Sequence, residues 1–202
     1  MAYKIYRHGN RKEKSIALTF DDGPHPLFTV SILKSLAEYN IKATFFITGK
    51  DAEEHSELVQ KIIHEGHEIG NHSFSHKSMI FRSIIFIINE IEKTDKILKN
   101  LGVKGEIYFR PPYGRMDTIA RMVLRKMRKK IILWDNGPKD FKCLSSEEVV
   151  DKVLKKLKPG SIIVLHDGGG VDRSITVKAV DMLIPEILKK GYKFQTVSEL
   201  IS

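Results

Sequence analysis

The sequence predicts an α/β protein whose parallel sheet closes, or nearly closes, into a barrel wrapped by helices. Seven short apolar segments alternate with six amphipathic ones, a pattern typical of a parallel sheet wound with helices. Ionisable residues follow five of the seven apolar segments, as expected where chemistry gathers at the carboxyl ends of barrel strands. The 202 residues suit one domain with a sizeable core. We expect a single domain over 1–202, with its core over about 15–202.

The expected strands are short runs rich in β-branched and aromatic residues. They cover 16–20, 43–48, 67–72, 107–110, 131–134, 162–166 and 193–197. The expected helices cover 27–39, 57–65, 80–100, 117–129, 145–158 and 174–190. Ser145 and Glu148 predict a capping box at the fifth helix. Pro185 predicts a kink in the last helix.

The charge balance favours anionic partners. Lys and Arg outnumber Asp and Glu by 34 to 25, a net charge of +9, which suits nucleic acid, an anionic membrane or an anionic wall polymer. Much of the charge lies in the basic segments 7–14 and 125–130. No aromatic residues are interleaved with them as in nucleic-acid-binding motifs, so nucleic acid is not the expected partner.

Targeting and redox signals are sparse. The most apolar run, 84–88, is too short to span a bilayer, and the first ten residues contain no apolar signal core. The single cysteine, Cys143, excludes an internal disulfide. We expect an extracytoplasmic or wall-associated bacterial protein if an export segment has been removed, and a cytoplasmic one otherwise.

His72 and His76 lie four residues apart after the third expected strand, a common spacing of metal ligands. An added carboxylate would give a set of two histidines and one aspartate, which leaves a position open as a catalytic zinc site requires. On the spacing alone, two surface or capped histidines remain the alternative.

Asp21 and Asp22 end the first expected strand side by side, although adjacent carboxylates repel each other. One of them can bind a metal, and the other can remain free as a general base. Arg110, after the fourth expected strand, can keep that base ionised. A polar Asp-Asp-Gly-Pro turn with a solvated arginine elsewhere is the alternative.

His166 ends the apolar run IIVLH, which is typical of a buried parallel strand. A protonated His166 could donate to a leaving group, and Asp140 could raise its pKa through the opposite charge. The alternative is a core histidine with satisfied hydrogen bonds.

Five motifs in chain order carry a resemblance to a known family: TFDDGP, HSFSH, RPPYG, a degenerate WDNGPKDF, and VLH. Together they resemble the polysaccharide deacetylases, metal-dependent carbohydrate esterases with a distorted seven-stranded β/α barrel. The resemblance runs from about Ser15 to the C-terminus. It implies hydrolysis of N-acetyl groups on an amino-sugar polymer, either peptidoglycan or chitin-type N-acetylglucosamine, with release of acetate.

The resemblance also implies a role for each motif residue. Asp22, His72 and His76 match the ligands of a divalent metal, zinc first, with cobalt or another divalent ion also fitting. The catalytic set comprises Asp21 as base, Arg110 orienting that base, the Tyr113 N–H as oxyanion donor, Asp140 tuning the acid, and His166 as the acid.

The substrate would contact a further set of residues. Trp134, Phe141 and Val164 would line the pocket for the acetyl methyl group, and Pro111 would add a substrate contact. Two of these depart from the family pattern, which usually has tryptophan at Phe141 and leucine at Val164. Gly137 also stands where the family usually has an acid. These departures leave the substrate and the rate open.

Other functions fit parts of the same pattern. An O-acetyl xylan esterase or another amidohydrolase could use the same site, and a non-catalytic carbohydrate-binding relative could keep it without turnover. A basic nucleic-acid-binding protein would show salt-dependent DNA binding without metal. The expected partner is an N-acetylated polysaccharide; the oligomeric state is not predicted.

Overall fold

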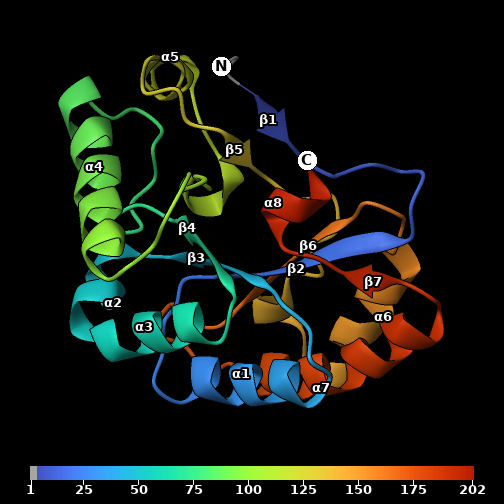
Figure 1. The fold of residues 1–202 in the computed structure, drawn as a ribbon. Helices are drawn as coiled ribbons and strands as arrows, with labels where there is room; N and C mark the ends of the chain where they lie inside the picture. The colour runs from blue at the N-terminus through green and yellow to red at the C-terminus, as the bar shows by residue number, and fades with distance from the viewer. Residues whose placement is uncertain (1–3) are drawn as a thin grey trace.

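The computed structural model describes residues 4–202 (Figure 1); residues 1–3 of the expected domain lie outside it. Its strands are β1 (Ile5–Tyr6), β2 (Ser15–Asp21), β3 (Thr44–Ile47), β4 (Glu68–Asn71), β5 (Ile131–Ile132), β6 (Ile162–His166) and β7 (Lys193–Phe194). Its helices are α1 (Phe28–Glu38), α2 (Gly49–Glu54), α3 (Ser56–His64), α4 (Ile84–Asn100), α5 (Thr118–Lys126), α6 (Ser146–Lys156), α7 (Ser174–Lys189) and α8 (Val197–Leu200). Two 3₁₀ turns are η1 (Pro112–Gly114) and η2 (Asp140–Lys142).

The strands form a distorted β/α barrel. Parallel strands run in the order β4-β3-β2-β6, with β7 beside the start of β2 and β1 paired to β5. Parallel bridges from Phe109 to Asn71 and to Ile131 continue the order from β4 to β5. A further parallel bridge joins Asn136, just after β5, to Ile163 in β6. These bridges complete the circuit of parallel neighbours that the alternating sequence predicts.

The expected strand at 107–110 is reduced to a bridge at Phe109. On the β5 side Phe109 donates to the Lys130 carbonyl and accepts from the Ile132 N–H. On the β4 side Asn71 donates to the Tyr108 carbonyl and accepts from the Arg110 N–H. Pro111 and Pro112 follow directly and have no N–H groups to continue a ladder. β1 was not expected, and the expected last strand is cut short because Thr196 begins α8.

The helix ends also differ from the expectation in part. Helices α2 and α8 were not expected, and α8 carries a full capping box between Thr196 and Glu199. Ser145 caps α6 as predicted, but the Glu148 carboxylate accepts from the Leu144 N–H, so the reciprocal half of that capping box was wrong. α7 extends over Pro185.

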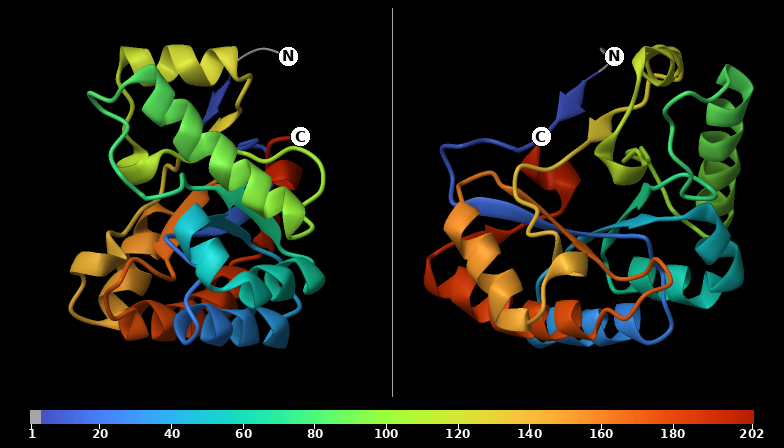
Figure 2. Two further views of the ribbon diagram at one scale, coloured as in Figure 1. Left: turned by 90° about the vertical axis from the view of Figure 1, so that its left-hand side faces the viewer. Right: turned by 180° about the vertical axis from the view of Figure 1, so that it is seen from behind.

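Side chains along β2 point alternately to the apolar core between the strands and the helices and into the barrel interior. Ile16, Leu18 and Phe20 belong to the main apolar cluster, with residues of helices α1, α6 and α7. The two long helices α1 and α7 lie side by side beneath the strands (Figures 1 and 2). Because successive side chains of a strand point to opposite faces, Thr19 and Asp21 point into the barrel.

Strand register brings two candidate site residues to one edge. Asp21, the last residue of β2, pairs with His166, the last residue of β6. Both therefore lie at the carboxyl end of the parallel strands, where the sequence predicts the site. None of the helices within residues 4–202 combines the length and the apolar character needed to cross a membrane.

Gly70 tests how tightly the barrel interior is packed. A Cβ at this position would lie 2.4 Å from Cε1 of the buried Phe46 ring. We predict that Gly70→Ala lowers the free energy of unfolding by about 1–3 kcal/mol through overpacking, measured by denaturant unfolding. Phe46→Leu in the same chain should relieve the overlap, so the double variant should lose less than the sum of the two single losses. Additive losses, or a Gly70→Ala protein as stable as wild type, would contradict this packing.

Candidate functional site

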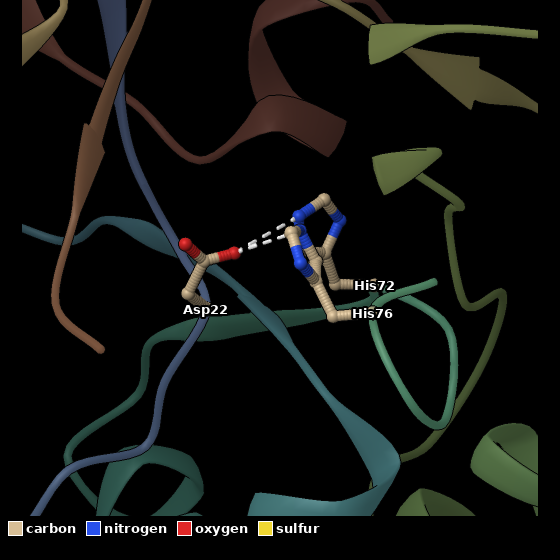
Figure 3. A group of neighbouring side chains, drawn as sticks. All are labelled: Asp22, His72 and His76. Carbon is tan, nitrogen blue, oxygen red and sulfur yellow. Dashed lines mark ion pairs between the residues drawn. The ribbon is translucent and has the colours of Figure 1, made fainter. Parts of the chain in front are cut away.

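Asp22, His72 and His76 converge at the carboxyl ends of β2 and β4. In Figure 3 both imidazoles face the Asp22 carboxylate. Asp22 Oδ1 lies 3.4 Å from His72 Nε2 and 3.1 Å from His76 Nε2. One ligand atom from each residue lies within 4.8 Å of the others, so the three could share a single ion.

The chemistry of this group fits a metal. Asp22 Oδ1 is buried and receives no hydrogen bond within the part of the chain that the structure describes. His72 Nδ1 lies 2.7 Å from the Arg110 carbonyl; because a carbonyl can only accept, Nδ1 carries the proton and Nε2 offers its lone pair towards Asp22. An outer-shell bond of this kind orients metal-ligating histidines. Two imidazoles and one carboxylate suit zinc or a similar divalent ion.

The charges within this group compensate one another. Burial alone would raise the pKa of Asp22, but the neighbouring imidazoles of His72 and His76 hold that pKa below its usual range. Burial alone would lower the pKa of His72, but the Asp21 and Asp22 carboxylates raise it. A cation that binds here needs the Nε2 lone pair of His72, which protonation removes, so binding should weaken on acidification.

The loops that carry these ligands adopt unusual backbone conformations. Asp22, Ser73, His76 and Tyr113 all have positive φ, between 53° and 74°, a region that residues other than glycine seldom adopt. Local bonds hold two of them: the Asn71 side chain accepts from the Ser73 N–H, and the Ser73 hydroxyl accepts from the His76 N–H. Strained residues of this kind cluster at functional sites.

The second acid, Asp21, faces a different partner. Arg110 is fully buried, and its Nη1 donates to Asp21 Oδ1 at 2.5 Å and to the Thr19 hydroxyl at 2.8 Å. The Arg110 Nε donates to the Ile132 carbonyl at 3.2 Å. The two adjacent acids therefore diverge, Asp21 to Arg110 and Asp22 to the histidines, and each repulsive charge has its own compensation.

His166 and Asp140 form a second buried pair. His166 Nδ1 lies 2.7 Å from Asp140 Oδ1, and Asp140 Oδ2 accepts from the His166 N–H and from the Thr176 hydroxyl. Burial opposes both charges, but mutual pairing raises the pKa of His166 and lowers the pKa of Asp140. The pair therefore favours a protonated His166 whose Nε2 is left for another partner.

A cavity of about 820 Å³ joins these groups. Ten of the twelve predicted site residues line it: Asp21, Asp22, His72, His76, Tyr113, Trp134, Asp140, Phe141, Val164 and His166. Arg110 lies buried beneath the cavity, bonded to Asp21. Pro111 is buried and does not line the cavity, so its substrate contact stays a prediction. The chain turns after it, and the exposed Tyr113 ring tilts over His76 instead, with the ring centroids 4.8 Å apart.

The Trp134 ring fills the space that a side chain at Gly137 would need. A Cβ at Gly137 would lie 2.7 Å from Trp134 Nε1 and 3.0 Å from Val164 Cγ1. A Cβ at Gly114 would lie 2.7 Å from Cη2 of the same indole. The Trp134 ring therefore occupies a slot between two glycines, where a larger side chain would displace it. Phe141 lies edge-on to His166, with centroids 5.3 Å apart.

Sequence reasoning missed Arg173. This buried arginine before α7 lies 3.7 Å from Asp22 Oδ2 and donates to the Gly168 carbonyl at 2.7 Å. It also lines the cavity. No motif singled it out, since its partner Asp22 lies far away in the chain.

Asp167 is a further buried acid beside the site. Its buried carboxylate accepts from the Thr29 hydroxyl at 2.5 Å and fills the space that a Gly23 side chain would need. Burial, with the charges of Asp22 and Asp21, raises the pKa of Asp167 to about 7. Asp167 therefore supports the turn that carries Asp21 and Asp22.

Comparison with known proteins identifies the family. The polysaccharide deacetylase family model matches residues 8–132. A peptidoglycan-N-acetylglucosamine deacetylase from Bacillus cereus is 39% identical over 94% of this chain and 89% of its own. The crystal structure of the Bc1960 peptidoglycan N-acetylglucosamine deacetylase superposes with a TM-score of 0.94 at 34% identity, covering 98% of this chain and 93% of that one.

A further solved structure shows that related chains differ in activity. BA3943 of Bacillus anthracis, described as a CE4 family pseudoenzyme, superposes with a TM-score of 0.90 at 25% identity over all of this chain and 70% of its own. Catalytic activity in this family therefore depends on individual residues and not on the fold alone. By its family match, sequence identity and superposition, this chain belongs to the polysaccharide deacetylase family.

Proposed function

We propose that this protein is a metal-dependent hydrolase that removes N-acetyl groups from an amino-sugar polymer. One observation carries the proposal: a single cavity holds the Asp22-His72-His76 group together with two separately charged pairs, Asp21–Arg110 and His166–Asp140. Paired titratable groups with different environments supply a base and an acid for one reaction.

Asp22, His72 and His76 would hold the metal. A divalent ion there would polarise the acetamide carbonyl and lower the pKa of the attacking water. We propose zinc, since two imidazoles and one carboxylate suit it, with cobalt as an alternative on the same ligands.

The remaining residues would handle protons and charge. Asp21 takes a proton from the attacking water, while the Arg110 guanidinium donates to Oδ1 and orients the carboxylate. The Tyr113 N–H stabilises the developing oxyanion, a contribution of about 3–4 kcal/mol per donor in known cases. His166 then donates its Nε2 proton to the leaving amine, because Asp140 holds Nδ1. The products are acetate and a free amino sugar.

The walls of the cavity support an anionic glycan. Of the charged residues that line it, Asp21, Asp22, Asp140 and Arg173 are engaged within the site. The exposed ones are three cations, Arg115, Lys139 and Lys142, and one acid, Asp172, and the whole chain has a net charge of +9. Peptidoglycan carries carboxylates, whereas chitin is neutral, so electrostatic complementarity favours peptidoglycan. The name of the Bacillus cereus relative agrees with this substrate class.

A substrate panel tests the proposal against its rivals. Acetate release would be measured from peptidoglycan, N-acetylglucosamine oligomers and acetylated xylan, with zinc-loaded and chelator-treated protein. The proposal expects release from an amino-sugar substrate that chelation stops and zinc restores. Release from xylan alone would favour an O-acetyl esterase. Zinc binding without release from any of them would favour a non-catalytic relative.

The base assignment can be separated from metal binding. We predict that Asp21→Asn lowers kcat by at least about 100-fold, because the amide cannot accept the proton, while zinc stoichiometry measured by elemental analysis stays at the wild-type value. His72→Ala should lose the zinc, and the exposed His64→Ala should keep both zinc and activity. Near-normal acetate release by a folded Asp21→Asn protein would refute the base assignment.

The His166–Asp140 pair predicts the alkaline side of the pH profile. His166 acts while protonated and its pKa is raised in the fold, so activity should be present below that pKa and fall as pH rises through it. Asp140→Asn removes the charge that raises the pKa, so the descending limb of kcat/KM against pH should move to lower pH.

Thr176→Val provides the matched control for this shift. It removes a neutral hydrogen bond to Asp140 Oδ2 and leaves the carboxylate charge in place. The descending limb of its pH profile should therefore move less than that of Asp140→Asn. A descending limb at the same pH in Asp140→Asn and wild type would exclude Asp140 as the residue that tunes the acid.

A further inference from the structure

The first turn of α4, the loop before it and the outer side of α5 expose a group of large apolar side chains. We call this group the α4–α5 surface; its apolar members are Phe81, Ile84, Ile85, Ile119 and Met122. Phe81 is 92% exposed and Ile85 72% exposed. The start of α4 lies close to α5 at the same end of the molecule (Figures 1 and 2).

These side chains are held outward by a defined backbone. Phe81 has a φ of 57°, a conformation unusual for a bulky residue. Its N–H donates to Asp117 Oδ2 at 2.8 Å, and Asp117 Oδ1 accepts from the Ala120 N–H to cap α5. The opposite sides of both helices already fill a buried cluster that includes Ile87 and Val123. The exposed members are therefore presented to solvent and are not required for that core.

The charged side chains of the same two segments are cationic, with one exception. Residues 77–89 and 113–129 contain eight cationic side chains and one carboxylate, Asp117, whose oxygens are engaged by backbone N–H groups. The cations are Lys77, Arg82, Arg115, Arg121, Arg125, Lys126, Arg128 and Lys129. Lys129 pairs with Asp95. On α5 the exposed Arg121 and Arg125 alternate with the exposed Ile119 and Met122.

We propose that the α4–α5 surface binds the interface of an anionic phospholipid bilayer. Cations pair with the phosphates of anionic headgroups, and apolar side chains between them enter the boundary with the acyl chains. A soluble polyanion, such as nucleic acid or a phosphate-rich wall polymer, would use the cations but leave the exposed isoleucines, phenylalanine and methionine without a partner. The combination of charge and apolar anchors therefore favours the lipid surface.

The surface adjoins the cavity. Arg115 lines the cavity, and Asp117, two residues later, anchors Phe81. Binding through this surface would hold the cavity rim near the bilayer. Attachment of the α4–α5 surface to a bilayer does not depend on the proposed chemistry.

Vesicle sedimentation of the full chain tests the proposal. The vesicles would contain phosphatidylcholine alone, or equal parts phosphatidylcholine and phosphatidylglycerol, at low salt. We expect at least about tenfold tighter binding to the anionic vesicles, since each cation near the surface contributes roughly fivefold. High salt should weaken this binding.

Matched variants distinguish binding through the α4–α5 surface from attraction by the overall charge of the chain. Arg121→Glu with Arg125→Glu should weaken binding to anionic vesicles by at least about 25-fold, and Lys155→Glu with Lys156→Glu, an equal charge change exposed on α6, by less than about twofold. Phe81→Ser with Ile85→Ser should weaken it at least about fivefold. The equally exposed pair Leu27→Ser with Leu144→Ser should leave it unchanged.

Three results would overturn the proposal. The first is equal binding of wild type to neutral and anionic vesicles. The second is an equal loss from the α6 and α5 charge variants. The third is unchanged binding by the Phe81 and Ile85 variant together with equal affinity for double-stranded DNA, which would indicate a polyanion surface. Met122→Ser provides a second apolar test if the double variant fails to fold, which thermal unfolding would report.

Discussion

The site depends on one buried cation, the guanidinium of Arg110. It donates to the hydroxyl of Thr19 and the carboxylate of Asp21 on β2, and to the Ile132 carbonyl on β5. Its guanidinium carbon lies 3.9 Å from the centroid of the Phe46 ring on β3. The backbone carbonyl of the same residue accepts from His72. One residue therefore joins three strands and connects the candidate base to a candidate metal ligand.

Burying this cation is costly unless its partners are in place, since the loss of hydration of a buried ion exceeds a single Coulomb contact. This requirement constrains the neighbourhood. Gly70 must lack a side chain so that Phe46 can lie beneath the guanidinium. Thr19 must supply a hydroxyl between the apolar Leu18 and Phe20 of β2. The same logic holds for Asp22, whose Oδ1 accepts no hydrogen bond from residues 4–202 and lies beside the two imidazoles, where a cation could bind.

Sequence reasoning found the residues whose chemistry is compressed into short motifs. Asp21, Asp22, His72, His76 and His166 all lie at or just after strand ends, so the rule for carboxyl ends of parallel strands predicts that they meet at one edge. The alternating pattern likewise predicted the barrel. The fourth strand was overestimated because the apolar run IYFR outweighed the two prolines that end its ladder.

The remaining features depend on contacts between distant parts of the chain. Arg173 meets Asp22, and Thr29 meets Asp167 across 138 positions; neither pair leaves a periodicity or a spacing in the sequence. Pro111 belongs to a motif but does not line the cavity, because a residue within a motif need not face the site. Short elements such as β1 and α2 lack the length that periodicity requires.

The most direct measurement of the central claim is the turnover of zinc-loaded Arg110→Lys on N-acetylglucosamine oligomers. Lysine keeps the charge but cannot reproduce the planar fork that reaches Thr19, Asp21 and Ile132 together. If the guanidinium aims the base, kcat should fall by at least about tenfold while zinc remains bound and the protein remains folded. Wild-type turnover by this variant would show that the geometry around Arg110 does not organise the reaction.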